Sequence, residues 1–160
     1  MQRKSRQQLK ILQITEQICR YGRGNGEFPL FYKEEVVMKI REAINDCDQL
    51  YKNTYKFGNK LKWLSDLDRR IYTELISPRK NPAITSFEGY TEDTDIETDL
   101  LVPDEYAEMY VKYLVSKIDY YNGEWERYNN SAAQFNELFS SYAAYYNRTH
   151  EYATHKRMRV

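Results

Sequence analysis

The sequence predicts a mainly α-helical protein, a helical bundle of about four to five helices with a long helical hairpin near the C-terminus. Apolar residues recur at spacings of three and four over several stretches of the 160-residue chain, as they do on one face of an α-helix. Glycine and proline fall between these stretches, where helices end. The one long stretch without this periodicity, residues 77–102, contains six of the 24 acidic residues.

The strongest periodic pattern runs from Pro103 to Asn147 and predicts two antiparallel helices joined at Asn122-Gly123. Pro103 suits the first turn of a helix, and Gly123 can adopt the left-handed conformation that commonly ends one. Pairing the two helices would bury one apolar stripe from each. The first stripe is Ala107, Val111, Leu114, Ile118 and Tyr121. The second stripe is Trp125, Tyr128, Ala132, Phe135, Phe139, Tyr142 and Tyr146.

Shorter helices are predicted upstream, at about residues 8–21, 33–51 and 59–76. A glycine run at 22–26 follows the first helix, polar residues 52–58 follow the second, and Pro78 ends the third. The third helix is expected to expose a charged, solvated face. This face comprises Asp66, Asp68, Arg69 and Arg70.

Residues 77–102 form an irregular acidic loop in this interpretation. Within the loop, Ile84–Tyr90 could form a short strand or half of a β-hairpin. A loop of this length in a compact domain is usually functional or becomes ordered against a partner. We therefore expect the loop to contact a neighbouring subunit or partner. The candidate contact residues are Phe87, Tyr90, Asp93, Asp95, Glu97 and Asp99.

The charges cancel over the whole chain, which has 24 basic and 24 acidic residues, but they are segregated along it. Both ends are basic, whereas residues 88–108 carry many acidic side chains and no basic one. We therefore predict a helical domain, residues 8–149, between a basic N-terminal arm, residues 1–7, and an extended basic C-terminal arm, residues 150–160. Such segregation suggests that different ends meet different surfaces, although solvated termini would give the same pattern.

Composition also bears on compartment and contacts. The sequence contains no apolar run of membrane-spanning length and no apolar signal-peptide core, so we expect a soluble protein made in the cytoplasm. Cys19 and Cys47 lie on apolar helical faces and are expected to be reduced core thiols. The 16 tyrosines fit either partner contacts or the half-buried boundary of a small helical domain.

No catalytic, cofactor-binding or metal-binding motif is predicted. The acidic loop matches the liganding positions one, three, five, seven and twelve of a calcium-binding loop with Asp93, Asp95, Glu97, Asp99 and Asp104. Thr98 stands where the sharp turn requires glycine, and Pro103 interrupts the exit, so a solvated acidic loop is favoured. His150 and His155 have no partners at zinc-ligand spacing.

Five blocks of sequence carry a resemblance: Trp63–Tyr72, Thr98–Tyr106, Lys117–Glu124, Arg127–Asn136 and Tyr145–Thr149. They resemble parts of small connector proteins encoded between the portal and tail genes of tailed bacteriophages. The first block resembles the short helix of these proteins, and the second is similar to their loop leading into a helix. This is the head–tail adaptor, or head-completion, family. The likeness covers roughly residues 36–150 as ordered blocks and departs from the family pattern in the first thirty residues and at 52–58.

The resemblance implies a structural virion protein without catalysis, assembled in the host cytoplasm and located at the head–tail junction. It implies a ring of twelve helical subunits under the portal protein, with a tail or neck protein on the opposite side. Encapsidated DNA would pass through the ring without sequence-specific binding. The resemblance also implies that the C-terminal arm reaches the portal. The candidate portal-binding residues are Tyr152, His155, Lys156, Arg157, Met158, Arg159 and Val160.

An alternative function is a DNA-binding packaging or regulatory protein, which the two basic ends would suit. This alternative predicts binding to duplex DNA that weakens steeply with salt. The sequence shows no helix-turn-helix pattern with a basic second helix, so the structural role is preferred.

Overall fold

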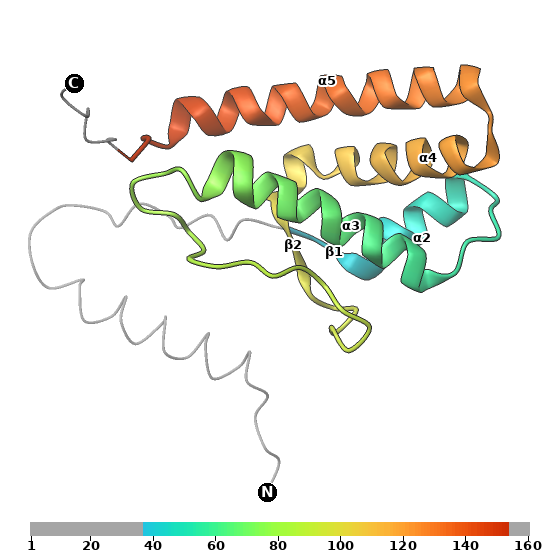
Figure 1. Ribbon diagram of the computed structural model, residues 1–160, viewed down its shortest axis with the longest axis horizontal. Helices are drawn as coiled ribbons and strands as arrows, with labels where there is room; N and C mark the ends of the chain where they lie inside the picture. Colours follow the sequence, from blue (N-terminus) through green and yellow to red (C-terminus); the bar gives the residue numbers. More distant parts are fainter. Residues whose placement is uncertain (1–36, 154–160) are drawn as a thin grey trace, which may run out of the picture. The chain divides into compact units, whose positions relative to one another are not determined.

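The computed structural model describes residues 37–153 (Figure 1). Several predictions concern residues outside this part of the chain: the N-terminal arm, the helix at 8–21, the glycine run at 22–26, Cys19, and the portal-binding candidates His155 to Val160.

The described part of the chain is mainly helical, as the sequence predicts, and it contains four α-helices and one two-stranded sheet. A π-helical segment, Tyr72–Ile76, continues α3, and a 3-10 turn, Asp104–Tyr106, leads toward α4. The strands and α-helices are β1 (Val37–Lys39), α2 (Ile40–Leu50), α3 (Phe57–Ile71), β2 (Asp99–Pro103), α4 (Glu108–Asn122) and α5 (Trp125–Thr149).

The predicted hairpin is confirmed: α4 and α5 lie antiparallel, side by side, and meet at a tight turn (Figure 1). Gly123 adopts the left-handed conformation there, with φ of 74°. The Gly123 N–H donates to the Tyr120 carbonyl at 3.1 Å, and the Glu124 N–H donates to the Asp119 carbonyl at 3.0 Å. These bonds satisfy carbonyls that the end of α4 would otherwise leave unpaired, so the turn ends the helix where the sequence indicates.

The predicted apolar stripes are buried along most of the hairpin but not beside its turn. Ala107, Val111, Leu114 and Ile118 of the first helix, and Phe135, Tyr142 and Tyr146 of the second, are buried. The prediction is wrong for Tyr121 and Trp125, which are 57% and 60% exposed. Both flank the turn at the end of the hairpin, where a side chain has neighbours on fewer sides.

This difference gives a stability prediction. Phe135→Ala should lower the free energy of unfolding by about 3–5 kcal/mol, because it leaves a cavity in the core. Trp125→Ala should change it by less than about 1 kcal/mol, because most of the ring already contacts solvent. Chemical denaturation measures both values, and equal losses at the two positions would contradict the buried and exposed ends described here.

The strand assignments also differ from the sequence predictions. Val37–Lys39, predicted as helix, forms β1 and pairs antiparallel with β2, whereas Ile84–Tyr90 forms no strand. Leu100 and Val102 of β2 are buried and alternate with more exposed residues, as expected for a strand with one core face. Helix α2 begins only at Ile40, where the loop supplies acceptors for the first N–H groups. The Ile40 N–H donates to the Thr98 carbonyl at 3.1 Å, and the Arg41 N–H to the Ile96 carbonyl at 3.0 Å.

The core lies between α2, α3, α4 and the inner face of α5. Helix α3 begins at Phe57, inside the stretch predicted as a turn, and its π-helical continuation ends at Ile76, as the sequence indicates. Cys47 is a buried free thiol, as predicted, and burial raises its pKa to about 11. Among the helices of residues 37–153, none combines the length and apolar character needed to cross a lipid bilayer.

Candidate interaction surfaces

Two carboxylates of the acidic loop, Asp95 and Glu97, interact with groups of the same chain. Glu97 forms ion pairs with Lys39 at 3.1 Å and Arg41 at 2.8 Å, and Asp95 accepts the Glu97 N–H at 3.0 Å. Within residues 37–153, no cluster of three or more His, Cys, Asp or Glu side chains is arranged to hold a metal ion. The acidic residues at calcium-loop spacing therefore lie in a loop that Glu97 links to β1 and α2 through its two ion pairs.

The buried carboxylate of Asp68 in α3 holds the same loop against the core. Asp68 is fully buried on α3, although the sequence assigned it to a solvated face, and that prediction is wrong. It accepts hydrogen bonds from the Tyr90 hydroxyl at 2.5 Å, the Leu101 N–H at 3.3 Å and the Tyr110 hydroxyl. The Tyr110 oxygen in turn accepts the Val102 N–H at 3.2 Å. One carboxylate thus joins α3, the loop, β2 and α4.

Burial governs the protonation of this cluster. It raises the pKa of Asp68 to about 6, although the tyrosine and Leu101 donors oppose that rise. Burial and the neighbouring Asp68 charge raise the pKa of both Tyr90 and Tyr110, so both hydroxyls remain protonated donors at neutral pH. The cluster links α3 to the loop, β2 and α4 through hydrogen bonds to one carboxylate.

Close backbone approach fixes the loop against α3. Gly89 has φ of 99°, and a Cβ added there would clash with the Ser65 hydroxyl and the Arg69 guanidinium. Those two side chains bond the loop backbone: Ser65 accepts the Tyr90 N–H at 2.8 Å, and Arg69 donates to the Glu88 carbonyl at 2.9 Å. Only glycine fits this position without strain.

Apart from the ion-paired Glu97, the candidate contact residues of the loop divide into two groups by their exposure. Phe87 and Tyr90 are half-buried, with ring centroids 5.3 Å apart, and they pack toward the body of the domain. Asp93 and Asp99 are exposed, and Asp95 is exposed apart from its bond to the loop backbone. Contact of these residues with a partner stays a prediction.

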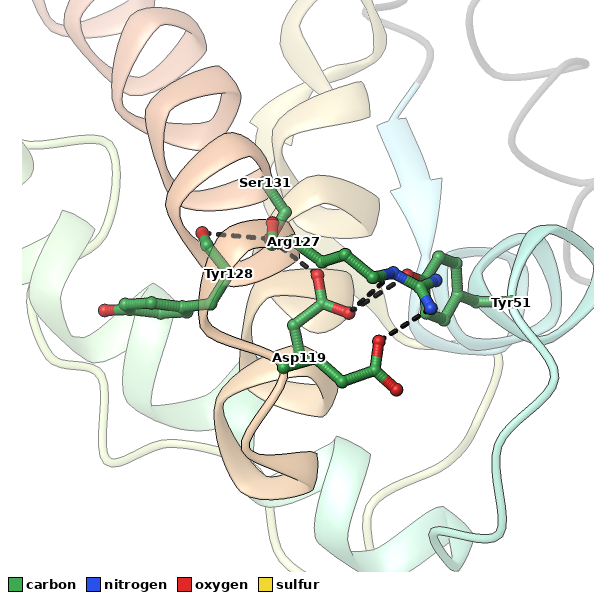
Figure 2. A network of polar contacts seen from close by, with 6 residues as sticks. Tyr51, Asp119, Arg127, Tyr128 and Ser131 are labelled. Carbon is green, nitrogen blue, oxygen red and sulfur yellow. Dashed lines mark hydrogen bonds and ion pairs between the residues drawn. The ribbon is translucent and has the colours of Figure 1, made fainter.

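A second buried carboxylate, Asp119, ties the hairpin to α2 (Figure 2). Asp119 is 1% exposed and accepts hydrogen bonds from the Tyr51 hydroxyl at 3.0 Å and the Ser131 hydroxyl at 2.8 Å. Arg127 lies 3.8 Å from the same carboxylate, and its guanidinium stands 4.4 Å from the centre of the Tyr51 ring. Figure 2 shows these side chains converging from α4, α5 and the end of α2, which fixes the turn end of the hairpin.

Partly exposed aromatic rings cover that turn end. We call Tyr120, Tyr121, Trp125 and Tyr128 the aromatic end patch. The Tyr120 ring packs edge-to-face against the other three, with centroid distances of 5.3, 5.8 and 5.5 Å respectively. Tyr121 also stacks on Trp63 of α3 at 5.5 Å. Tyr120 is 45% exposed, and the more exposed Tyr121 and Trp125 complete a continuous aromatic surface.

This patch has the properties of a protein-binding surface. Tyrosine and tryptophan rings are enriched where proteins meet, and they contribute much of the binding energy there. A groove of about 480 Å³ between α4 and α5 adjoins the patch and shares Tyr120, Tyr121 and Tyr128 with it. Lys117 also lines this groove, and its ammonium lies 5.2 Å from the centre of the Tyr113 ring.

The other end of α5 is closed by a buried arginine. Arg79 is 3% exposed and donates to the Leu75 carbonyl at 2.8 Å, the His150 carbonyl at 3.0 Å and the Asn147 side chain. Its guanidinium carbon lies 3.7 Å from the centre of the Tyr152 ring. Arg79 forms no ion pair with any residue of 37–153. The carbonyls that it bonds lie at the C-terminal ends of two helical segments, where the helix dipole favours a cation.

Backbone pairing holds the residues that follow α5, and we call His150–Ala153 the C-terminal clasp. The Lys80 N–H donates to the Glu151 carbonyl at 3.0 Å, and the Ala153 N–H donates to the Pro78 carbonyl at 2.9 Å. The first residues of the predicted C-terminal arm therefore pack on their own domain. Tyr152, a candidate portal-binding residue, donates its hydroxyl to Asn147 at 3.1 Å and remains 55% exposed.

Comparison of the chain with protein-family models, with curated proteins and with solved structures gives no match.

Proposed function

We propose that this protein is a structural head–tail adaptor of a tailed bacteriophage, a helical-bundle subunit of a ring between the portal and the tail. The observation that carries the proposal is that two different surfaces lie at the two ends of α5. Figure 1 shows the helix from its turn with α4 to its C-terminal end. The aromatic end patch covers one end, and the C-terminal clasp, the last described segment of the chain, packs at the other. The 25-residue helix separates them by about 37 Å at 1.5 Å per residue.

A protein that joins two partners needs this arrangement, because each partner must reach its own surface. In the proposed ring of twelve copies, residues 154–160 bind the portal through their basic and apolar side chains, and the aromatic end patch faces the tail or neck protein. DNA passes through the channel without sequence-specific contacts. The protein performs no catalysis and holds no cofactor in this proposal, and its buried carboxylates, Asp68 and Asp119, join helices.

Negative-stain electron microscopy of the protein mixed with the portal protein of the same phage tests the proposal. We expect an added layer of density on one face of the portal, with the same rotational symmetry as the portal. Portal particles without the protein are the control. Portals that remain unchanged at saturating protein concentration would contradict the adaptor function.

A further inference from the structure

A second candidate surface lies beside α2 and shares no lining residue with the aromatic end patch. It is a groove of about 340 Å³ between β1, the second half of α2 and the start of α4. Its apolar lining comes from Met38, Leu50, Ala107 and Val111. Ala107 and Val111 are buried, whereas Leu50 is 71% exposed. Leu50 therefore extends the apolar lining of the groove out to solvent, and an apolar surface with a polar rim can mark an interaction site.

The rim of this groove is acidic. Asp46, Asp104 and Glu108 line it together with the base Lys112. The Lys112 ammonium lies 3.6 Å from the Glu108 carboxylate, so these two charges offset each other. The side chains of Asp46 and Asp104 form no ion pair with any residue of 37–153. The groove therefore suits a segment that carries both positive charge and spaced apolar residues.

We propose that the groove binds the N-terminal segment of a second copy of this chain, an inference that rests on the ring proposed above. Residues 1–10 carry no acidic side chain, and their bases are Arg3, Lys4, Arg6 and Lys10. The helix predicted at 8–21 places isoleucines on one face, and these are Ile11, Ile14 and Ile18. The isoleucines match the apolar floor, and the bases match the acidic rim.

The proposed contact between copies is of the kind that builds a ring. The groove and the segment are different parts of the chain, so each copy gives its segment to one neighbour and receives a segment from the other. Such a heterologous contact closes into a ring when the rotation between copies permits it. The portal and the neck protein then bind the ends of the subunit, and the flank serves the lateral contact.

A charge-swap experiment on the full chain tests this contact. One variant reverses the groove, Asp46→Lys with Asp104→Lys, and the other reverses the segment, Arg6→Glu with Lys10→Glu. Each variant alone should associate at least about tenfold more weakly than the wild type, because like charges then face each other. An equimolar mixture should regain association as mixed oligomers. In the mixture, the reversed segment meets the reversed groove, and the native segment meets the native groove.

Native mass spectrometry distinguishes the outcomes by the masses of the oligomers. The matched control, Glu126→Lys with Glu137→Lys, makes the same charge change at exposed positions outside the groove and should associate like the wild type. Reversed variants that associate like the wild type would overturn the groove contact and leave the ring intact. A mixture that regains nothing would overturn the contact between copies. A wild-type chain that stays monomeric, alone and with the portal, would overturn both the contact and the proposed adaptor function.

Discussion

Asp68→Ala is expected to lower the free energy of unfolding by about 3–5 kcal/mol, as removal of one partner from a buried polar network does. The substitution leaves the Tyr90 and Tyr110 hydroxyls and the Leu101 N–H without their acceptor in the core. Asp66→Ala is the matched control on the same helix. Asp66 is 48% exposed, and within residues 37–153 its ion pair is with exposed Arg69, so its loss should cost less than about 0.5 kcal/mol. Chemical denaturation that shows equal losses for both variants would contradict the Asp68 cluster.

The pH dependence of stability provides a second readout of the same carboxylate. Because burial raises the pKa of Asp68 to about 6 from 3.8, the folded state holds this proton more tightly than the unfolded state. Stability contributed by Asp68 is therefore fully present below about pH 4 and is lost as the pH rises through 6, a change of about 3 kcal/mol. Asp68→Asn should remove this component, so the difference between wild type and variant should vary over pH 4–6. A constant difference across that range would contradict the raised pKa.

The two buried carboxylates show where sequence patterns are ambiguous. The apolar stripe of the third predicted helix is Leu61, Leu64, Leu67, Ile71 and Leu75, and Asp68 lies four residues after Leu64 and three before Ile71. The spacing alone thus places Asp68 toward the core. A carboxylate is rarely buried without partners, however, and its partners, Tyr90 and Tyr110, come from distant parts of the chain. Local periodicity contains no information about such contacts, so the sequence favoured a solvated face.

The hairpin was predictable because its signals are local. The turn at Gly123 and the three–four spacing on either side need no knowledge of the rest of the chain. Strand β1 was not predictable in the same way. Its few residues continue an apolar pattern into α2, and only pairing with the distant β2 makes them a strand. The exposure of Trp125 was not predictable for a similar reason. Its spacing fits the apolar stripe, but the close packing of the hairpin ends before this residue.

Two C-terminal truncations should separate folding from attachment to the portal. Removing residues 150–160 deletes the C-terminal clasp, so buried Arg79 loses the His150 carbonyl and the Tyr152 ring. We expect that truncation to cost about 2–3 kcal/mol, which lowers the melting temperature by roughly 5–10 °C. Removing only residues 154–160 leaves every clasp contact in place and should leave the melting temperature nearly unchanged.

The shorter truncation should nevertheless abolish attachment to the portal, because it removes the basic and apolar side chains from His155 to Val160. Thermal unfolding and co-sedimentation with portal particles measure the two effects on the same samples. The substitution Asn147→Ala, which keeps residues 150–160, is the complementary control: it removes a hydrogen-bond acceptor from buried Arg79, so it should lower stability and retain attachment. If the protein lacking residues 154–160 still occupied portals fully, attachment would have to come from the helical domain, and the proposed role of the arm would be wrong.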